Sequence, residues 1–328
     1  MTSTTQPLEA RLHALLPSHP ALRTSLLPAL LTSFTQIAQT LRTSQRVALA
    51  GSANHFGDDQ LNVDVSCEKH IRDALEGCPS VVVASSEEDP VEVAVAHAPG
   101  AQTGEERYSV AFDPLDGSSI IAPNWTVGTI VGVWAGDTAV GVSSSQQIAS
   151  LFGVYGPRTT AYMAIRLPGQ DDGGVCVELG LNEDNRTWDV LREKVTLTQE
   201  PKARYFAPAN LRSAAYSEPY MDLIHHFIRE RYNLRYCGGL VPDLVHTFVK
   251  GHGVYVSPVT ARDGPKLRRL YELLPVALLM ECAGGRAVDP QDGRDVLDRV
   301  VRGTEEKGGL VCGNAEDVEM VMRTLRRG

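Results

Sequence analysis

Acidic side chains gather between residues 58 and 116, close to the expected boundaries of helices and strands. Asp113 and Asp116 are three positions apart, on either side of Pro114 and Leu115, and they follow a β-branched and aromatic run at 108–112 that predicts a strand. In a turn of this length, both carboxylates and the Leu115 carbonyl can point toward one position. The other acids of this set are Asp58, Asp64, Glu87 and Glu88.

Such a set of oxygen ligands predicts a site for hard divalent cations. Mg²⁺ typically binds a few carboxylates and fills its remaining positions with water and substrate phosphate. Clustered carboxylates also repel one another when they are buried, and a bound cation relieves that repulsion. Taken alone, Glu87 and Glu88 could be solvated loop acids, but the complete set favours a site for two or three Mg²⁺ ions, with Mn²⁺ as a possible substitute.

The residues that follow Asp116 indicate phosphate as the bound group. Gly117 lets the backbone approach a ligand closely, and Ser118 and Ser119 add amide N–H groups and hydroxyls that can hold phosphate oxygens. The sequence contains neither GxxxxGK[ST] nor GxGxxG, so the usual signals of nucleotide-dependent phosphoryl transfer and dinucleotide binding are missing. Cations and amides together therefore favour hydrolysis of a phosphate ester by a multi-metal scheme.

Helices and strands alternate around these residues. Apolar residues spaced three or four apart from Leu22 to Leu41 predict an amphipathic helix, and a second helix is expected at 63–75. Short β-branched runs at 81–84 and 108–112 predict strands that end at the carboxylates. The remaining expected elements are a hairpin at 127–142, strands at 160–167, 175–180, 253–256 and 309–312, and helices at 220–230, 267–282 and 316–325. This mixture predicts layers of sheet and helix.

Composition excludes several classes of protein. Of 328 residues, 43% are hydrophobic and 22% charged, the net charge is −9, and basic residues are scattered, so neither disorder nor a nucleic-acid partner is expected. No apolar stretch is long enough for a membrane span. The N-terminal residues show no targeting signal and the six cysteines form no CxxC pair, which favours reduced thiols and a cytoplasmic location.

Several motifs together resemble the sugar-bisphosphatase family, which contains fructose-1,6-bisphosphatase and sedoheptulose-1,7-bisphosphatase. The resemblance extends from about Gly51 to the C-terminus, in the order and spacing of the family. Segments at 120, 126–134, 155–160, 210–212 and 234–236 are more similar to the sedoheptulose branch. The matching motifs are Gly51-Ser52-Ala53-Asn54 with Gly57-Asp58, Ser86-Glu87-Glu88-Asp89, the run from Phe112 to Ser119, the run from Tyr236 to Asp243, Lys266-Leu267-Arg268 with Tyr271-Glu272, and Ala283-Gly284-Gly285.

The resemblance implies a role for each matched residue. It implies that Asp64 and Glu88 orient or deprotonate the attacking water, and that Asp58 joins an additional cation and takes part in catalysis. Arg235 is implied to act across a subunit interface. The implied metal ligands are Glu87, Asp113, Asp116, Glu272 and the Leu115 carbonyl. The implied substrate-binding residues are Asn54, Gly117, Ser118 and Ser119 for the phosphate that is cleaved, and Asn210, Arg235, Tyr236, Lys266 and Arg268 for the distal phosphate and the sugar.

The expected protein is a Mg²⁺-dependent phosphatase that removes the 1-phosphate of sedoheptulose 1,7-bisphosphate. Fructose 1,6-bisphosphate is the alternative or additional substrate; a phosphatase of inositol or nucleotide monophosphates and a catalytically silent sugar-phosphate-binding protein are further alternatives. The resemblance implies an α/β/α/β/α sandwich with a metal- and phosphate-binding domain at 1–195 and a sugar-binding domain at 196–328. It also implies a homodimer or homotetramer.

Overall fold

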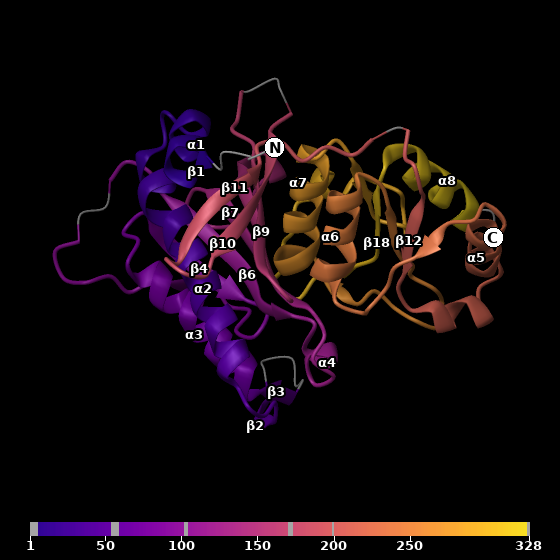
Figure 1. The fold of residues 1–328 in the computed structure, drawn as a ribbon, viewed down its shortest axis with the longest axis horizontal. Coiled ribbons are helices and arrows are strands. Elements are labelled where there is room, and N and C mark those ends of the chain that lie inside the picture. Colours follow the sequence, from indigo (N-terminus) through magenta and orange to yellow (C-terminus); the bar gives the residue numbers. More distant parts are fainter. Residues whose placement is uncertain (1–5, 54–58, 102–103, 170–172, 199, 327–328) are drawn as a thin grey trace.

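The computed structural model describes residues 6–53, 59–101, 104–169, 173–198 and 200–326. Asn54 and Asp58, which were predicted to bind substrate and a cation, lie outside the described residues. The architecture has two large sheets, two two-stranded sheets and helices arranged in layers between and around the large sheets (Figure 1).

The larger sheet has nine strands, and all of them come from residues 6–192. The β4–β6 pair is parallel, whereas the other neighbouring strands are antiparallel. In spatial order the strands are β1 (Gln6–Pro7), β11 (Thr187–Arg192), β10 (Val175–Asn182), β9 (Thr159–Ile165), β8 (Gln147–Tyr155), β7 (Val127–Ala135), β6 (Tyr108–Asp116), β4 (Val81–Ser86) and β5 (Val93–Ala94).

The second sheet has five strands, which come from residues 205–313. Their order is β13 (Asn233–Leu234), β12 (Tyr205–Pro208), β14 (Val254–Ser257), β18 (Leu310–Gly313) and β16 (Arg286–Val288). The small sheets pair β2 (Leu49–Ala53) with β3 (Asp59–Leu61), and β15 (Leu267–Arg268) with β17 (Lys307–Gly308).

Helices form three layers around the two large sheets (Figure 1). One face of the nine-stranded sheet is covered by α1 (Leu8–Leu15), η1 (Leu22–Leu26), α2 (Leu27–Thr43) and α3 (Asn62–Glu76). Between the sheets lie α6 (Leu240–Lys250), η4 (Arg269–Leu273) and α7 (Leu274–Cys282), and the outer layer holds α5 (Glu218–Arg229) and α8 (Ala315–Leu325). Short helices are α4 (Ser118–Ile121), η2 (Ser144–Gln146), η3 (Leu211–Ala215) and η5 (Val296–Asp298).

Three hydrophobic cores join the layers. The first joins α2 and α3 to the nine-stranded sheet, the second surrounds α6 and α7, and the third joins α5 and α8 to the five-stranded sheet. This arrangement confirms the predicted α/β/α/β/α sandwich. None of the described helices has the length and apolar character that a membrane span requires.

Two sequence predictions of local structure were wrong. The expected hairpin at 127–142 is absent, because β7 pairs with β8 and the residues between them form a longer connection. The expected helix at 267–282 begins with β15 and the π-helical turn η4, and only then continues as α7. Pro275 is the second residue of α7 and has no N–H to donate within the helical segment that continues from η4, so it lies directly after the change from π-helical to α-helical geometry.

Candidate active site

Glu87 and Asp113 are brought together by the parallel pairing of β4 and β6. Ser86 is the register partner of Phe112, and the Glu87 N–H donates a 3.0 Å hydrogen bond to the Phe112 carbonyl. Since parallel strands end at the same edge of a sheet, the residues that follow this pair lie side by side. The structure thus places two of the predicted metal ligands next to each other.

Glu272 completes this group from a distant part of the sequence. Ligand oxygens of Glu87, Asp113 and Glu272 all lie within 4.8 Å of one another. Glu272 belongs to the π-helical turn η4 and is only 7% exposed. A turn of this kind is frequent at functional sites, where it directs a side chain that a regular helix would aim elsewhere.

Burial and mutual repulsion both act on these carboxylates. Burial raises the pKa of Asp113 well above its usual value, and the neighbouring Glu87, Asp116 and Glu272 raise it further. Burial also raises the pKa of Glu272, with a further increase from Glu87. A divalent cation would offset this repulsion, and the donors are all oxygens, so the residues present fit Mg²⁺ or Mn²⁺.

Asp116 lies beside this group but has additional partners in the C-terminal half. Its Oδ1 accepts a hydrogen bond of 2.9 Å from the Leu240 N–H, and its Oδ2 accepts one of 2.6 Å from the Val241 N–H. Burial raises the pKa of Asp116 to about 6, although both hydrogen bonds act in the opposite direction. Asp116 therefore caps the N-terminus of α6 and connects the two halves of the chain.

Arg268 faces the carboxylate group. Its Nε lies 3.6 Å from Glu87 Oε1, and its backbone N–H donates a hydrogen bond to Glu272. The side chain is only 5% exposed. Sequence reasoning placed this residue with those that bind the distal phosphate and sugar, and in the structure its guanidinium lies beside Glu87, a predicted metal ligand.

Asp64 and Glu88 lie at the same end of the sheet. Asp64 is buried in the first turn of α3, where its Oδ2 accepts a 2.8 Å hydrogen bond from the Leu61 N–H. Its Oδ1 has no hydrogen-bond partner among the described residues. Burial raises the pKa of Asp64 to about 6, and the charge of Glu88 adds to this increase.

The Gly117–Ser119 segment is open to solvent. Gly117 adopts a φ of 98°, in the left-handed region that favours glycine, and it precedes the single turn α4. Ser118 and Ser119 are exposed at the start of that turn, directly after Asp116. The structure thus presents their hydroxyl and amide groups next to the carboxylates.

Three predicted substrate-binding residues form a second group. Lys266 Nζ donates a 2.7 Å hydrogen bond to Asn210 Oδ1. Burial raises the pKa of Tyr236, against the opposing effect of a hydrogen bond from the Asn210 backbone. Asn210, Tyr236 and Lys266 therefore meet around the start of η3.

Arg235 lies apart from both groups. It follows the edge strand β13, donates a 2.7 Å hydrogen bond to the Leu234 carbonyl, and has its guanidinium 5.5 Å from the centre of the Tyr205 ring. The residue is exposed. Its implied role at the site of a neighbouring subunit stays a prediction.

Two positioning residues were not identified from the sequence. Asp243 accepts hydrogen bonds from the N–H groups of Cys237 at 2.7 Å and Gly238 at 3.1 Å, which fixes the segment before α6. Gly128 permits close packing of α6 on β7, since a Cβ at this position would lie 2.5 Å from the Val241 Cβ. Neither role is visible in local sequence patterns, because Asp243 acts on the loop before α6 and Gly128 acts through a contact between the two halves.

Comparison with known families identifies two matching regions. Residues 13–175 match the family described as "Fructose-1-6-bisphosphatase, N-terminal domain", and residues 199–326 match "Fructose-1-6-bisphosphatase, C-terminal domain". The match thus begins well before Gly51, where the sequence motifs start.

Similar proteins include enzymes of both branches. The chloroplastic sedoheptulose-1,7-bisphosphatase of Triticum aestivum is 36% identical over 290 residues, which cover 88% of this chain and 70% of that protein. The class 1 fructose-1,6-bisphosphatase of Syntrophotalea carbinolica is 36% identical over 298 residues, covering 88% of this chain and 85% of the relative. A Toxoplasma gondii crystal structure assigned as a sedoheptulose-1,7 bisphosphatase has a TM-score of 0.86 and 35% identity, with 98% of each chain covered.

Proposed function

The chain belongs to the fructose-1,6-bisphosphatase family of enzymes, which are phosphatases of sugar bisphosphates, and we propose that it hydrolyses the 1-phosphate of sedoheptulose 1,7-bisphosphate. The products are sedoheptulose 7-phosphate and phosphate, and the reaction requires Mg²⁺. The motifs of the sedoheptulose branch and the similarity to enzymes named for that substrate support this choice.

The relation between Lys266 and Arg268 carries the proposal of a substrate with two phosphates. Lys266 directly precedes the strand β15, and Arg268 is the second residue of that strand. Lys266 meets Asn210, whereas Arg268 meets Glu87. One short segment thus places one cationic side chain at each of the two polar groups. A substrate with a single phosphate would leave one of these two side chains without a phosphate to bind.

In this proposal the buried carboxylate group and the group around Lys266 have different roles. Glu87, Asp113, Asp116, Glu272 and the Leu115 carbonyl hold the metal ions, and Asp58 binds an additional cation. The bound cations supply Lewis-acid stabilisation of charge on the phosphate that is cleaved.

The protein groups around that phosphate act in the same direction. Arg268 neutralises charge at the reacting phosphate, while the segment 117–119 donates hydrogen bonds to it. Asp64 and Glu88 orient the attacking water and accept its proton, for which a pKa of about 6 at Asp64 is suited.

The second group fixes the rest of the substrate. Lys266, Asn210 and Tyr236 bind the distal phosphate and sugar, so that the reacting phosphate is held in one position. Ser213 is buried and donates a hydrogen bond to Asp263, so it offers no aromatic ring to this pocket.

Phosphate release from sedoheptulose 1,7-bisphosphate and fructose 1,6-bisphosphate, measured in parallel with Mg²⁺ and with a chelator, tests this function. We expect Mg²⁺-dependent release with the larger kcat/KM on the seven-carbon sugar. A larger kcat/KM on the six-carbon sugar would assign the chain to the fructose branch. Turnover of neither sugar would contradict the proposed activity.

A further inference from the structure

Glu272 is held in a different way from the other two members of the buried carboxylate group. Glu87 directly follows β4 and Asp113 lies within β6, and the ladder of hydrogen bonds between these strands and their neighbours fixes the backbone of both residues. Glu272 comes from the turn η4, between β15 and α7. The geometry of the group therefore depends on what holds η4 against the nine-stranded sheet.

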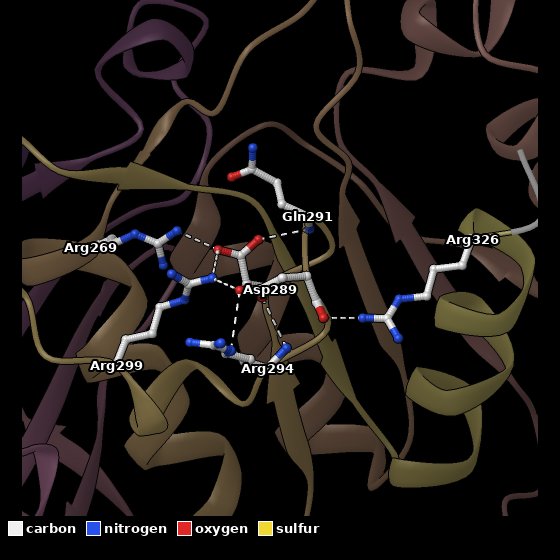
Figure 2. A network of polar contacts seen from close by, with 7 residues as sticks. Arg269, Asp289, Gln291, Arg294, Arg299 and Arg326 are labelled. Atoms are coloured by element: carbon white, nitrogen blue, oxygen red, sulfur yellow. Dashed lines mark hydrogen bonds and ion pairs between the residues drawn. The ribbon is translucent and has the colours of Figure 1, made fainter.

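Arg269 begins the same turn. Its residue is 6% exposed, and its guanidinium forms an ion pair and hydrogen bond with Asp289, which is fully buried (Figure 2). Asp289 Oδ1 also accepts a 2.9 Å hydrogen bond from the Gln291 N–H. The Arg269 N–H donates a 2.8 Å hydrogen bond to the Glu306 carbonyl, so both backbone and side chain of Arg269 are fixed.

Asp289 is itself part of a closed loop. Its N–H donates to the Arg294 carbonyl at 2.9 Å, and its carbonyl accepts from the Gly293 N–H at 2.7 Å. Arg299 lies 3.6 Å from its carboxylate, and Arg326, which follows α8, donates to the Asp292 carbonyl (Figure 2). The loop thus gives Arg269 a rigid partner.

Gly308 leaves room for this arrangement. A Cβ at Gly308 would lie 2.8 Å from the Arg269 Cζ. Gly308 belongs to β17, which pairs with β15 directly before η4. The guanidinium therefore lies close against the strand that also supports Arg268.

We infer that the buried Arg269–Asp289 pair is a positioning device that aims Glu272 at the metal ions. A buried ion pair adds little net stability compared with a hydrophobic pair of similar size, but its fork of hydrogen bonds fixes direction. Groups that orient metal ligands typically change metal affinity 10–100-fold when they are removed. This role rests on the proposed metal-dependent function of the same site.

The test measures metal binding without substrate. Mn²⁺ binding to the purified full chain, followed by calorimetric titration, should weaken about 10-fold or more in Asp289→Asn. The Mg²⁺ concentration for half-maximal phosphate release should rise by a similar factor, while KM for the sugar bisphosphate at saturating Mg²⁺ should not change. Asp292→Asn is the matched control, because Asp292 lies in the same loop but its carboxylate contacts Arg294 and Arg299.

A double variant separates positioning from stability. Arg269→Met combined with Asp289→Leu removes the pair without leaving a buried charge, so thermal stability should remain near that of the wild type while Mn²⁺ binding stays weak. If Asp289→Asn does not fold, Mn²⁺ binding to this double variant tests the positioning role instead. Wild-type Mn²⁺ affinity in the double variant would overturn the positioning role and leave the proposed function intact. A wild-type chain that binds neither Mn²⁺ nor Mg²⁺ would overturn both.

Discussion

The carboxylate of Asp116, at the end of β6, accepts a 2.6 Å hydrogen bond from the N–H of Val241, in the first turn of α6. One side chain thus serves as a predicted metal ligand and as the cap of a helix that packs between the two sheets. The predicted metal site and the contact between the two halves of the chain therefore share this residue.

Replacing Asp116 with Asn should affect both roles. An Asn side chain has one acceptor oxygen, so the N–H of either Leu240 or Val241 would face an NH₂ group without a partner. With Mg²⁺ present, which offsets the cost of the buried Asp116 charge, we expect a loss of about 1–3 kcal/mol in the free energy of unfolding, measured with urea, together with loss of phosphate release. Asp137→Asn, at an exposed ion pair with Arg107, is the control and should change neither. Unchanged stability of Asp116→Asn would contradict the capping role.

The contact between α6 and β7 can be tested at Gly128. In Gly128→Ala, the new methyl group would lie 2.5 Å from the Val241 Cβ, so helix and strand must move apart. We expect a loss of about 1–3 kcal/mol in unfolding free energy and reduced activity. Gly104→Ala provides the comparison, because a Cβ there meets nothing within 4 Å. Equal stabilities of the two variants would mean that this packing is not tight.

Lys266→Ala tests the division between the two groups of polar residues. Removal of a charged partner of the distal phosphate should raise KM for the bisphosphate about tenfold or more with little change in kcat. Lys307→Ala removes an exposed lysine nearby on β17 and should leave both constants unchanged. A fall in kcat at constant KM would instead place Lys266 at the reacting phosphate.

The sequence predicts the parts of the site that depend on local order. Glu87 and Asp113 each follow a β-branched run, so a common sheet edge could be expected before the structure was known. Periodicity alone could not place Glu272, because its position depends on a π-helical turn and on contacts with a strand more than a hundred residues earlier. Only the resemblance to the sugar-bisphosphatase family identified Glu272 as a metal ligand.

The same limit explains the residues whose partners were unexpected. Arg268 belongs to a matched motif, yet the motif does not reveal that its guanidinium lies beside Glu87. The partner of β7 was expected within 127–142, but it is β8. The connection between β7 and β8 spans residues 136–146, which is too long for the sequence to show this pairing. Long-range contacts of this kind arise from packing between layers and leave little trace in the order of the residues.

The pH dependence of stability should report the state of the carboxylate group. Without metal, burial and repulsion raise the pKa of Asp113 and Glu272, and burial raises those of Asp64 and Asp116 to about 6. The folded chain then keeps protons that the unfolded chain, with ordinary carboxyl pKa values of about 4, has already lost. The contribution of these groups to metal-free stability is therefore present below about pH 4 and falls as pH rises through the folded pKa values.

Mg²⁺ should reverse this decline, because it binds the deprotonated carboxylates and competes with protons for them. The increase in Tm caused by Mg²⁺ should thus be small at pH 5 and larger at pH 8, as measured by thermal unfolding across this range. Asp113→Asn should be more stable than the wild type without metal at pH 8, and it should lose most of the Mg²⁺ effect. An equal Mg²⁺ effect at pH 5 and pH 8 in the wild type would mean that the ions bind elsewhere than at these buried acids.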